Sequence, residues 1–289
     1  MKNVLITGIA GGFGKPTALA LLARGYAVAG SVRSRSGKNA TTVAELEAAG
    51  AKIVEMDVTD ATSTERGVAD AISQLGGFDI LFNNAGIGSY GIQELMSPEN
   101  MAQVFDVNVM GVQRVMRAAL PHLRAQGRGT VLYTSSLIGR IATPFYGTYS
   151  ASKWALEAIV ECYRTELSVF GIESCVIEPG AMPTAFFDGM VTPNDAAREA
   201  EYGEFAAVPA MSSAGLAEIL KATPEQRPER IAEAVVALLD MPFGVKPFRT
   251  VVDYVGVGPE IERYNDVLHD VTRNILTNFG IEQMLDLNA

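Results

Sequence analysis

A tyrosine and a lysine lie four positions apart in the middle of the chain, as Tyr149 and Lys153. On a helix this spacing places both side chains on one face. The ordinary pKa of a phenol is about 10, and a nearby cation favours the phenolate and lowers that pKa. The pair therefore predicts a proton donor, Tyr149, that Lys153 tunes toward the working pH. This chemistry suits reduction of a carbonyl, which takes up hydride at carbon and a proton at oxygen.

A glycine-rich run near the start of the chain reads Thr7-Gly8-Ile9-Ala10-Gly11-Gly12-Phe13-Gly14. It follows an apolar segment and precedes a segment of helical period, so we expect a strand-to-helix turn. Glycines there permit close approach of the backbone to a pyrophosphate, which the first N–H groups of the helix can bind. The run predicts a dinucleotide site with contacts at Gly8, Gly12, Phe13 and Gly14. The alternative is a glycine-rich turn without a ligand.

The second expected strand, residues 27–32, is followed by the basic side chains of Arg33 and Arg35. A site for NAD usually has an acidic residue at this point, which accepts from the ribose 2′-hydroxyl. Basic side chains fit a 2′-phosphate instead. The sequence therefore favours NADPH/NADP+ over NADH/NAD+, with Arg33 as a contact. A solvated basic loop is the alternative.

Short apolar runs alternate with longer stretches of helical period along the chain. This alternation predicts an α/β fold of the Rossmann type, a doubly wound parallel seven-stranded sheet with helices on both faces. Ligands of such sheets bind outside the carboxyl ends of the strands. The strands are expected at residues 2–6, 27–32, 52–56, 79–82, 130–134, 173–177 and 250–254.

Several helix starts carry recognisable signals. Ser97-Pro98 predicts an N-cap followed by proline at the first helical position, with a helix that runs to about residue 125. Thr42 with Glu45, and Thr62 with Glu65, match the capping-box pattern.

The whole chain, residues 1–289, is expected to form a single dinucleotide-binding and catalytic domain. Residues 182–223 contain no expected strand and are rich in Phe and Met, which predicts a lid over a hydrophobic substrate. Burial of this segment against a neighbouring subunit is the alternative. Residues 259–289 are expected to form a C-terminal helical extension.

Further motifs follow the later strands in a fixed order. They are Asn83-Asn84-Ala85-Gly86, Asn108, Ser135-Ser136 and Pro179-Gly180-Ala181-Met182-Pro183-Thr184. Ser136 lies 13 positions before Tyr149. With the glycine run and the Tyr149–Lys153 pair, this ordered set resembles the short-chain dehydrogenase/reductase superfamily over roughly residues 3–255.

The resemblance implies a catalytic set made of Asn108, Ser136, Tyr149 and Lys153. Ser136 would hydrogen-bond the substrate oxygen and stabilise the charge that develops there. Lys153 would also hold the nicotinamide ribose, and Asn108 would position a water linked to Lys153. Ser135 competes with Ser136, and only the spacing to Tyr149 favours the latter. Asn108 has a second interpretation, a polar residue at a helix kink.

The resemblance also implies contacts around the cofactor. Asp57 would accept from the adenine amino group, unless it is only a turn residue. Asn84, Ala85 and Gly86 would line the adenosine side, and Thr184 would bond the nicotinamide amide or the phosphates. The remaining implied contacts are Val58, Tyr149, Lys153, Pro179 and Gly180.

These features predict an NADPH-dependent carbonyl reductase that transfers hydride between nicotinamide and a hydrophobic ketone, aldehyde or secondary alcohol. An NAD-dependent alcohol dehydrogenase of the same superfamily is one alternative. A non-catalytic dinucleotide-sensing protein is another, although such relatives usually lose the tyrosine or the lysine, and this chain keeps both.

Composition narrows the set of partners. The chain has 23 basic and 33 acidic residues, a formal net charge of −10, which repels phosphates and argues against nucleic acid or anionic membranes. The two cysteines are expected to be buried free thiols, and the two histidines lack metal-ligand spacing, so no metal site is expected. An apolar strand at the start, without a signal-peptide core, predicts a cytoplasmic protein. The resemblance further implies a homodimer or homotetramer.

Overall fold

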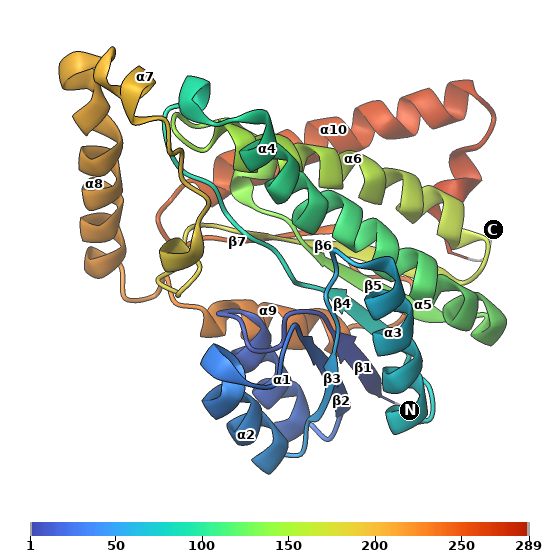
Figure 1. Ribbon diagram of the computed structural model, residues 1–289. Helices are drawn as coiled ribbons and strands as arrows, with labels where there is room; N and C mark the ends of the chain where they lie inside the picture. Colours follow the sequence, from blue (N-terminus) through green and yellow to red (C-terminus); the bar gives the residue numbers. More distant parts are fainter. Residues whose placement is uncertain (1, 288–289) are drawn as a thin grey trace.

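A single parallel sheet forms the centre of this computed structural model, which describes residues 2–287 (Figure 1). Residues 1, 288 and 289, which belong to the predicted domain and its extension, lie outside the described residues. The strands lie in the order β3-β2-β1-β4-β5-β6-β7, and every neighbouring pair is parallel. This confirms the predicted Rossmann-type α/β class. The strands are β1 (Asn3–Ile6), β2 (Ala27–Val32), β3 (Lys52–Glu55), β4 (Ile80–Asn83), β5 (Gly129–Thr134), β6 (Ile172–Pro179) and β7 (Arg249–Val252).

Two hydrophobic cores lie on the two faces of the sheet, because side chains alternate between the faces of a strand. In β1, Val4 and Ile6 belong to one core and Leu5 to the other. Helices α1 (Gly14–Ala23), α2 (Ala40–Ala48) and α9 (Glu229–Asp240) pack on the first face. Helices α3 (Ala61–Leu75), α5 (Val112–Gln126) and α6 (Gly147–Ser168) pack on the second. Strand order reverses beside β1, so the carboxyl ends of β1 and β4 form the switch point at which such folds bind ligands.

Two of the predicted helix caps are wrong. Helix α2 begins after Asn39 and has no side-chain cap, while the carboxylate of Asp60 caps α3 by accepting from the N–H of Ser63. Thr42 and Thr62 therefore lie inside the first turns, where the backbone is already helical and the capping position has passed. The predicted N-cap at Ser97 is present, with a reciprocal capping box to Asn100.

The long helix expected from residue 98 to about 125 is interrupted. Helix α4 (Pro98–Phe105) leads into a π-helical turn, Asp106–Gly111, before α5 begins. Such single wide turns occur frequently at functional sites. Gly111 lies against Val58, and a Cβ at this glycine would come within 2.8 Å of the Val58 side chain. The turn directs Asn108 inward, where its side chain is fully buried.

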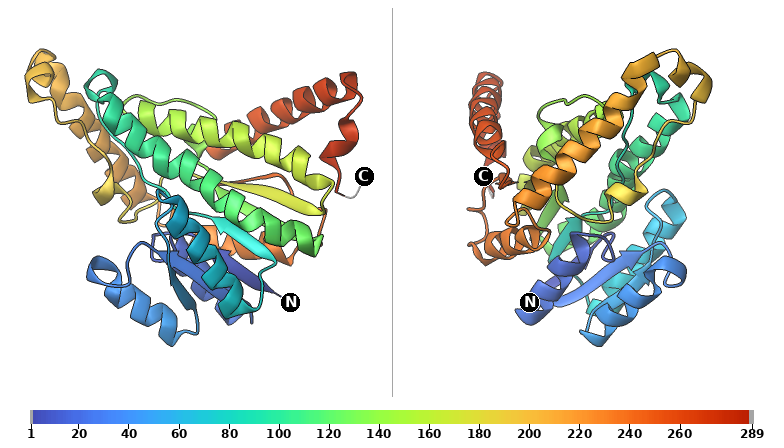
Figure 2. Two further views of the ribbon diagram at one scale, coloured as in Figure 1. Left: turned by 45° about the vertical axis from the view of Figure 1, so that its right-hand side comes forward. Right: turned by 90° about the vertical axis from the view of Figure 1, so that its left-hand side faces the viewer.

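Residues 182–223, which we call the lid segment, contain helices rather than a bare loop. The segment includes α7 (Ala196–Ala200) and α8 (Val208–Ala222), and α8 projects away from the sheet (Figures 1 and 2). In the first part of the lid segment, the backbone of Val191 forms hydrogen bonds with the backbone of Gly88 and Tyr90. These bonds attach the lid segment to the chain that follows β4.

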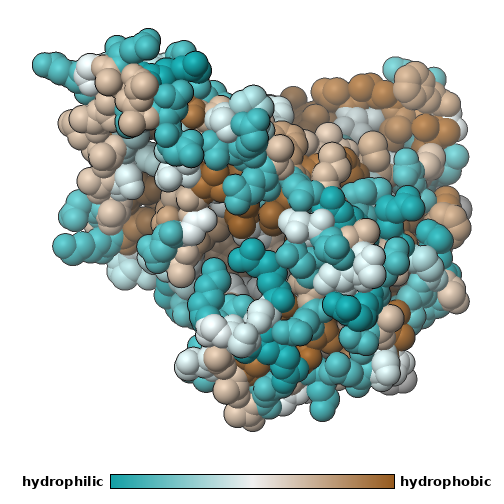
Figure 3. Space-filling view, viewed as in Figure 1, coloured by the Kyte–Doolittle hydropathy of each residue, from teal (hydrophilic) through white to brown (hydrophobic). Residues whose placement is uncertain are grey.

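The C-terminal extension is one long helix, α10 (Gly258–Asn278), followed by a short turn at Glu282–Leu285. Ile261 and Asn265 anchor its first half in the protein. Its second half projects on the side opposite to α8 (Figure 2), and brown surface lies at the upper right of Figure 3, where Figure 1 shows this helix. The exposed apolar side chains along α10 are Tyr264, Val267, Val271 and Ile275, and Phe279 follows directly after the helix. Within residues 2–287, no helix has the length and apolar character needed to cross a membrane.

Both cysteines are free thiols, as expected. Cys175 is buried in β6, but Cys162 is exposed on α6, so the prediction that both are buried is wrong for Cys162. Helix α6 covers the sheet with one face only, and Cys162 lies on the other.

Candidate active site

The glycine run forms a tight turn between β1 and α1. Gly8 adopts a left-handed backbone with φ of +67°, and its N–H donates to the Ser31 hydroxyl of β2 at 3.3 Å. A Cβ at Gly14 would lie 2.8 Å from the Ile9 Cα and closer still to the Gly8 carbonyl oxygen. Phe13 ends the turn immediately before α1 and packs at the edge of the core. The turn therefore needs glycine at these points. In the first turn of α1 the N–H groups of Lys15 and Thr17 donate to the Gly11 and Phe13 carbonyls, so the N–H groups that a dinucleotide pyrophosphate would meet are those of the turn itself, residues 12–14.

The chain that follows β6 closes over this turn. A Cβ at Gly12 would come within 2.6 Å of the Thr184 side chain. Pro179 ends β6, and the N–H of Gly180 donates to the Val252 carbonyl of β7. This bond fixes the direction in which the chain leaves β6 at the carboxyl edge of the sheet. Thr184 thus lies against the glycine turn.

Asn84 acts as a clamp between strand ends. Its amide donates to the Thr7 carbonyl at 3.0 Å, and its oxygen accepts from the Thr134 hydroxyl at 3.3 Å. The backbone N–H groups of Asn84 and Ala85 both donate to the Thr7 hydroxyl. The side chain of Asn84 is therefore already paired with protein groups, and it holds the carboxyl ends of β1, β4 and β5 together.

The basic residues after β2 differ in their environment. Arg35 is engaged by the Ile53 carbonyl at 3.1 Å and by an ion pair with Glu47, and Lys15 pairs with Glu45. Arg33 is exposed at the carboxyl end of β2, beside the glycine turn. Among these cations Arg33 is the one best placed to meet a 2′-phosphate.

Asp57 lies at the end of β3 in a turn. Its carboxylate accepts from the N–H and the hydroxyl of Thr59, at 2.9 and 2.7 Å. Partial burial would raise the pKa of Asp57, but these hydrogen bonds and the charge of Arg33 outweigh it and lower the pKa overall. The next residue, Val58, packs on Gly111. Asp57 is thus a turn residue that also presents an ionised carboxylate near Arg33.

Tyr149 and Lys153 lie together in the first turns of α6, as the spacing predicts. The Lys153 ammonium lies 5.7 Å from the centroid of the Tyr149 ring, and both residues are buried. The phenol of Tyr149 faces the hydroxyl of Ser136, which is partly exposed after β5. Ser135 is instead buried, and its hydroxyl has no partner among the described residues. The structure thus brings Ser136, and not Ser135, to the tyrosine.

The predicted lowering of the pKa of Tyr149 is wrong. Burial raises this pKa above its usual value, a smaller opposing effect comes from the hydrogen bond to Ser136, and the nearby Tyr146 raises it further. The sequence argument weighed only the lysine charge, whereas removal of the phenolate from water is the larger effect in this packed site. Tyr149 is therefore a neutral phenol at physiological pH.

Lys153 is a buried amine held by the protein backbone. Its ammonium donates to the Thr134 carbonyl at the end of β5, at 2.8 Å. Burial lowers the pKa of Lys153 to about 8, against a raising effect from Glu157. The amine therefore changes charge close to physiological pH.

Asn108 lies beside this pair but makes its hydrogen bonds to other groups. Its amide donates to the Ile87 carbonyl at 2.8 Å and to the Ser152 hydroxyl at 3.0 Å, and its oxygen accepts from the Ile87 N–H. A Cβ at Gly86 would lie 3.2 Å from the Asn108 oxygen and 3.7 Å from the Lys153 nitrogen. Gly86 thus keeps open the space next to both side chains.

Comparison with known proteins identifies the family. Residues 2–194 match the short chain dehydrogenase family. The chain belongs to this family. A solved short-chain dehydrogenase from Streptomyces avermitilis has the same fold, with a TM-score of 0.74 at 28% identity over 96% of both chains. The superfamily resemblance seen in the motifs is confirmed, and with it the enzyme class, an NAD(P)-dependent dehydrogenase or reductase.

Two characterised relatives are reductases. A 3-ketodihydrosphingosine reductase of Bacteroides thetaiotaomicron is 37% identical over 185 residues, which is 64% of this chain and 65% of that protein. An NADPH-dependent 3-dehydrocapnine reductase of Ornithobacterium rhinotracheale is 30% identical over 210 residues, 71% of this chain and 74% of that protein. The match to the first relative thus spans slightly less than two thirds of its length.

Sequence reasoning missed two residues of this short-chain dehydrogenase site. The Ser152 hydroxyl accepts from Asn108 and donates to the Tyr149 carbonyl at 2.7 Å, which ties the π-helical turn to α6. Phe186 of the lid segment packs edge-on against the Tyr149 ring, with centroids 5.6 Å apart. Ser152 stands next to Lys153 in the motif, and that adjacency was the available signal. Nothing local marked Phe186, since its contact depends on how the lid segment folds back.

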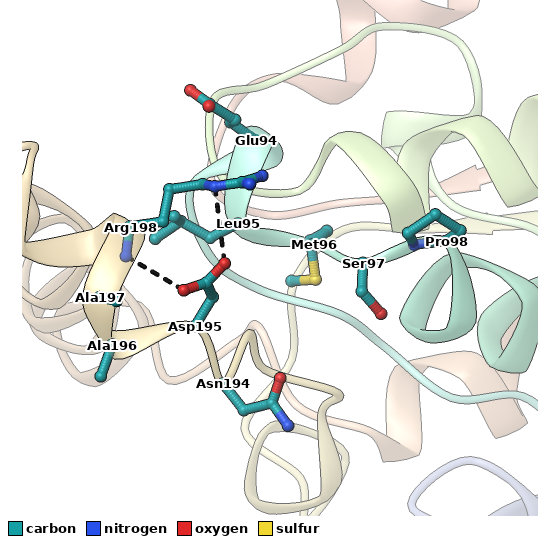
Figure 4. Close-up of a pocket in the computed structure, with 10 residues that line it drawn as sticks. All are labelled: Glu94, Leu95, Met96, Ser97, Pro98, Asn194, Asp195, Ala196, Ala197 and Arg198. Carbon is teal, nitrogen blue, oxygen red and sulfur yellow. Dashed lines mark hydrogen bonds and ion pairs between the residues drawn. The ribbon is translucent and has the colours of Figure 1, made fainter.

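A cavity of about 530 Å³ lies at the outer rim of the lid segment, between residues 94–98 and residues 194–198 (Figure 4). Its charged groups already have partners, since Asp195 accepts from the Arg198 backbone and pairs with its guanidinium, and Glu94 accepts from the Tyr202 hydroxyl. None of the predicted site residues lines this cavity. It is part of the contact between the lid segment and the body, and the chemistry lies elsewhere.

Behind the catalytic helix lies a buried group that we call the Arg–Glu cluster. It contains Arg140, Glu157, Glu178 and Arg249, and Asn265 of α10 closes it. Burial raises the pKa of Glu178 to about 8, and the neighbouring charge of Glu157 raises it further against the arginines. Glu178 is therefore largely protonated at neutral pH.

This shift makes the stability of the protein depend on pH. A carboxyl whose pKa is raised in the folded state stabilises the fold below its unfolded value, near 4.5, and that stabilisation is lost as pH rises through about 8. We expect the melting temperature to fall between pH 6 and pH 8, and Glu178→Gln to flatten that fall, as measured by calorimetry. The exposed Glu218→Gln is the control and should keep the unaltered slope. An unchanged slope in Glu178→Gln would contradict this assignment.

Proposed function

We propose that this protein is an NADPH-dependent carbonyl reductase acting on hydrophobic ketones or aldehydes. The observation that carries the proposal is a neutral, buried Tyr149 that faces Ser136, with Lys153 behind it, at the carboxyl edge of the sheet. The glycine turn fits the dinucleotide, whose nicotinamide supplies hydride to the carbonyl carbon when bound.

The chain's own residues supply the proton. Ser136 would hold the substrate oxygen by a hydrogen bond and stabilise the negative charge that grows on it. Tyr149 would give its phenol proton to that oxygen, which completes the alcohol. Lys153, protonated below a pKa of about 8, would stabilise the resulting phenolate until the phenol regains a proton. Asn108 would contribute through a water next to Lys153.

The raised pKa of Tyr149 favours reduction over alcohol oxidation. An alkoxide is a stronger base than a phenolate, so a phenol with a high pKa still gives its proton to the developing alkoxide. In the opposite direction the enzyme would need the phenolate, which burial makes scarce at neutral pH. This supports the reductase over the alternative, an alcohol dehydrogenase that works mainly in oxidation.

An apolar substrate is supported by the lid segment. Phe186 lies against Tyr149, and Phe187 packs on Phe186. A Cβ at Gly88 would come within 2.7 Å of both Met190 and Phe186. The absence of a side chain at Gly88 therefore lets these two lid side chains pack against the chain that lines the site. Aromatic and thioether side chains suit bulky apolar ligands. The two characterised reductase relatives named above support the same reaction.

The test is a steady-state assay of NADPH oxidation at 340 nm with a panel of aliphatic and aromatic ketones and aldehydes. We expect kcat/KM for reduction at pH 7 to exceed that for oxidation of the matching alcohols, and to be highest for uncharged apolar substrates. A sharp preference for charged sugars, or absence of turnover with every carbonyl, would overturn the proposal. The second outcome would favour the dinucleotide-sensing alternative.

The cofactor preference rests on Arg33, and a substitution there is expected to change it. Arg33→Ala should lower kcat/KM for NADPH by about 10- to 100-fold, because a charge-assisted contact to the 2′-phosphate is lost. Turnover with NADH should change little. The ratio of the two kcat/KM values measures this effect.

Arg35→Ala provides the matched control, since Arg35 is already occupied by Glu47 and the Ile53 carbonyl. It should leave the ratio close to that of the unaltered protein. A higher efficiency with NADH in the unaltered protein would refute the NADPH assignment.

We also propose a homodimer or homotetramer. Met110 of the π-helical turn and Trp154 of α6 are exposed apolar side chains on the segments that carry Asn108 and Tyr149. Burial of these side chains between subunits would stabilise an assembly. Gel filtration with light scattering measures the mass, and a monomer at micromolar concentration would contradict this.

A further inference from the structure

We propose that Glu157 is a positioning residue that keeps Lys153 protonated, and that the Arg–Glu cluster behind α6 holds Glu157 in place for this purpose. The inference rests on the proposed function, in which the Lys153 charge stabilises the phenolate of Tyr149. Glu157 itself touches neither substrate nor cofactor in that scheme.

Glu157 lies one helical turn after Lys153 on α6, and its side chain is 1% exposed. Residues four apart on a helix share a face. The groups that face Lys153 from the other packed elements are neutral: the Thr134 carbonyl of β5 and Asn108 of the π-helical turn. On α6 itself Lys153 faces the phenol of Tyr149. Glu157 therefore provides the negative charge that opposes the cost of burying the ammonium.

Two arginines fix the position of the Glu157 carboxylate. One of its oxygens accepts from Arg249 of β7, at 3.2 and 3.1 Å, and lies 3.5 Å from the guanidinium of Arg140. Arg140 belongs to the loop between Ser136 and Tyr149. Because Arg140 lies in this loop, the cluster is connected through the chain to Ser136 on one side and to Tyr149 on the other.

Three further side chains, Glu178, Glu161 and Asn265, surround these arginines. Glu178 of β6 lies 3.5 Å from Arg249 and 3.9 Å from Arg140, and Glu161 pairs with Arg249 at the rim. Asn265 of α10 accepts from Arg140 at 3.2 Å and donates to Glu178 at 2.5 Å. The C-terminal extension thus seals the far side of the cluster against water.

The second oxygen of Glu157 has no hydrogen-bond partner among residues 2–287. Both arginines contact the other oxygen, so they do not take up the whole carboxylate. The unpaired oxygen is buried one helical turn from the Lys153 ammonium, where a negative charge opposes the cost of burying that ammonium.

The substitution Glu157→Gln tests the inference while keeping the shape of the side chain. Loss of the negative charge leaves burial unopposed, so the pKa of Lys153 should fall by about one unit. The direct readout is the ¹³Cε chemical shift of Lys153 in ¹³C-lysine-labelled full-length protein, titrated from pH 5 to pH 10 and assigned with Lys153→Met. In the reductase assay the alkaline limb of kcat/KM should move to lower pH by the same amount.

Glu161→Gln is the matched control. Glu161 lies on the same helix and pairs with the same arginine, but burial and Glu157 alone shift the pKa of Lys153. The titration of Lys153 should therefore be unchanged in this variant. Glu157→Asp should largely restore the unaltered value, because it keeps the charge.

Glu157→Met, which keeps a similar volume without a charge, serves also if Glu157→Gln does not fold. It should lower the pKa of Lys153 in the same way. A Lys153 titration that is the same in the unaltered protein and in a folded variant without the Glu157 charge would overturn the inference. Because the titration needs no turnover, absence of carbonyl reduction by the unaltered protein would refute the proposed function separately.

Discussion

Replacement of Tyr149 by phenylalanine is expected to lower kcat for carbonyl reduction by about 10²- to 10⁴-fold, the usual contribution of a general acid. The substitution removes only the phenol oxygen. The ring would still pack on Phe186, and Lys153 would keep its bond to the Thr134 carbonyl. Stability and NADPH affinity should therefore change little. Stopped-flow single turnovers and NADPH fluorescence titration measure the two quantities separately.

Tyr146→Phe is the matched control for this experiment. Tyr146 lies one turn before Tyr149, and burial raises its pKa to about 12, so it too is a neutral phenol. It packs on Tyr90 and is placed outside the catalytic set. Its loss should reduce kcat by less than about threefold, with Tyr149 as the sole proton donor. Equal losses in the two variants, or a fully active Tyr149→Phe, would exclude Tyr149 as the donor.

Gly14→Ala is expected to have the largest effect on cofactor binding. The added Cβ would meet the Ile9 Cα at 2.8 Å and the Gly8 carbonyl, and both are backbone atoms that no rotamer change can move. The turn must open, which should cost about 1–3 kcal/mol of unfolding free energy. The N–H groups of residues 12–14, which would bind the pyrophosphate, would be displaced, so NADPH affinity should fall at least tenfold. Urea unfolding and fluorescence titration test these expectations.

Gly215→Ala in α8 is the control for the added methyl group, because no atom lies within 4 Å of a Cβ there. Removal of a helical glycine should stabilise by up to about 1 kcal/mol and leave NADPH affinity unaltered. Tight NADPH binding in Gly14→Ala would show that the turn does not hold the pyrophosphate.

The sequence alone determined the seven-stranded parallel sheet and the location of the glycine turn, whereas the order of the strands came from the structure. These features depend on short-range patterns: apolar runs of strand length, helical period and glycines at fixed offsets. The spacing of Tyr149 and Lys153 also placed both side chains together correctly, because a helix fixes that relation locally. The ends of helices were less certain from sequence, as the caps at Asn39 and Asp60 show, since several polar residues compete for one capping position.

Only the tertiary structure decided the chemistry of those side chains. Whether burial or the lysine charge sets the pKa of Tyr149 depends on how closely Phe186 and the neighbouring segments exclude water, and those contacts come from distant parts of the chain. The distinction between Ser135 and Ser136, and between Arg33 and Arg35, likewise depends on neighbours supplied by other elements. The Arg–Glu cluster takes Arg140 from the loop after β5, Glu178 from β6, Arg249 from β7 and Asn265 from α10. Folding brings these four residues together behind α6. A sequence records spacing along one element, whereas desolvation and charge coupling are set by atoms that folding brings together.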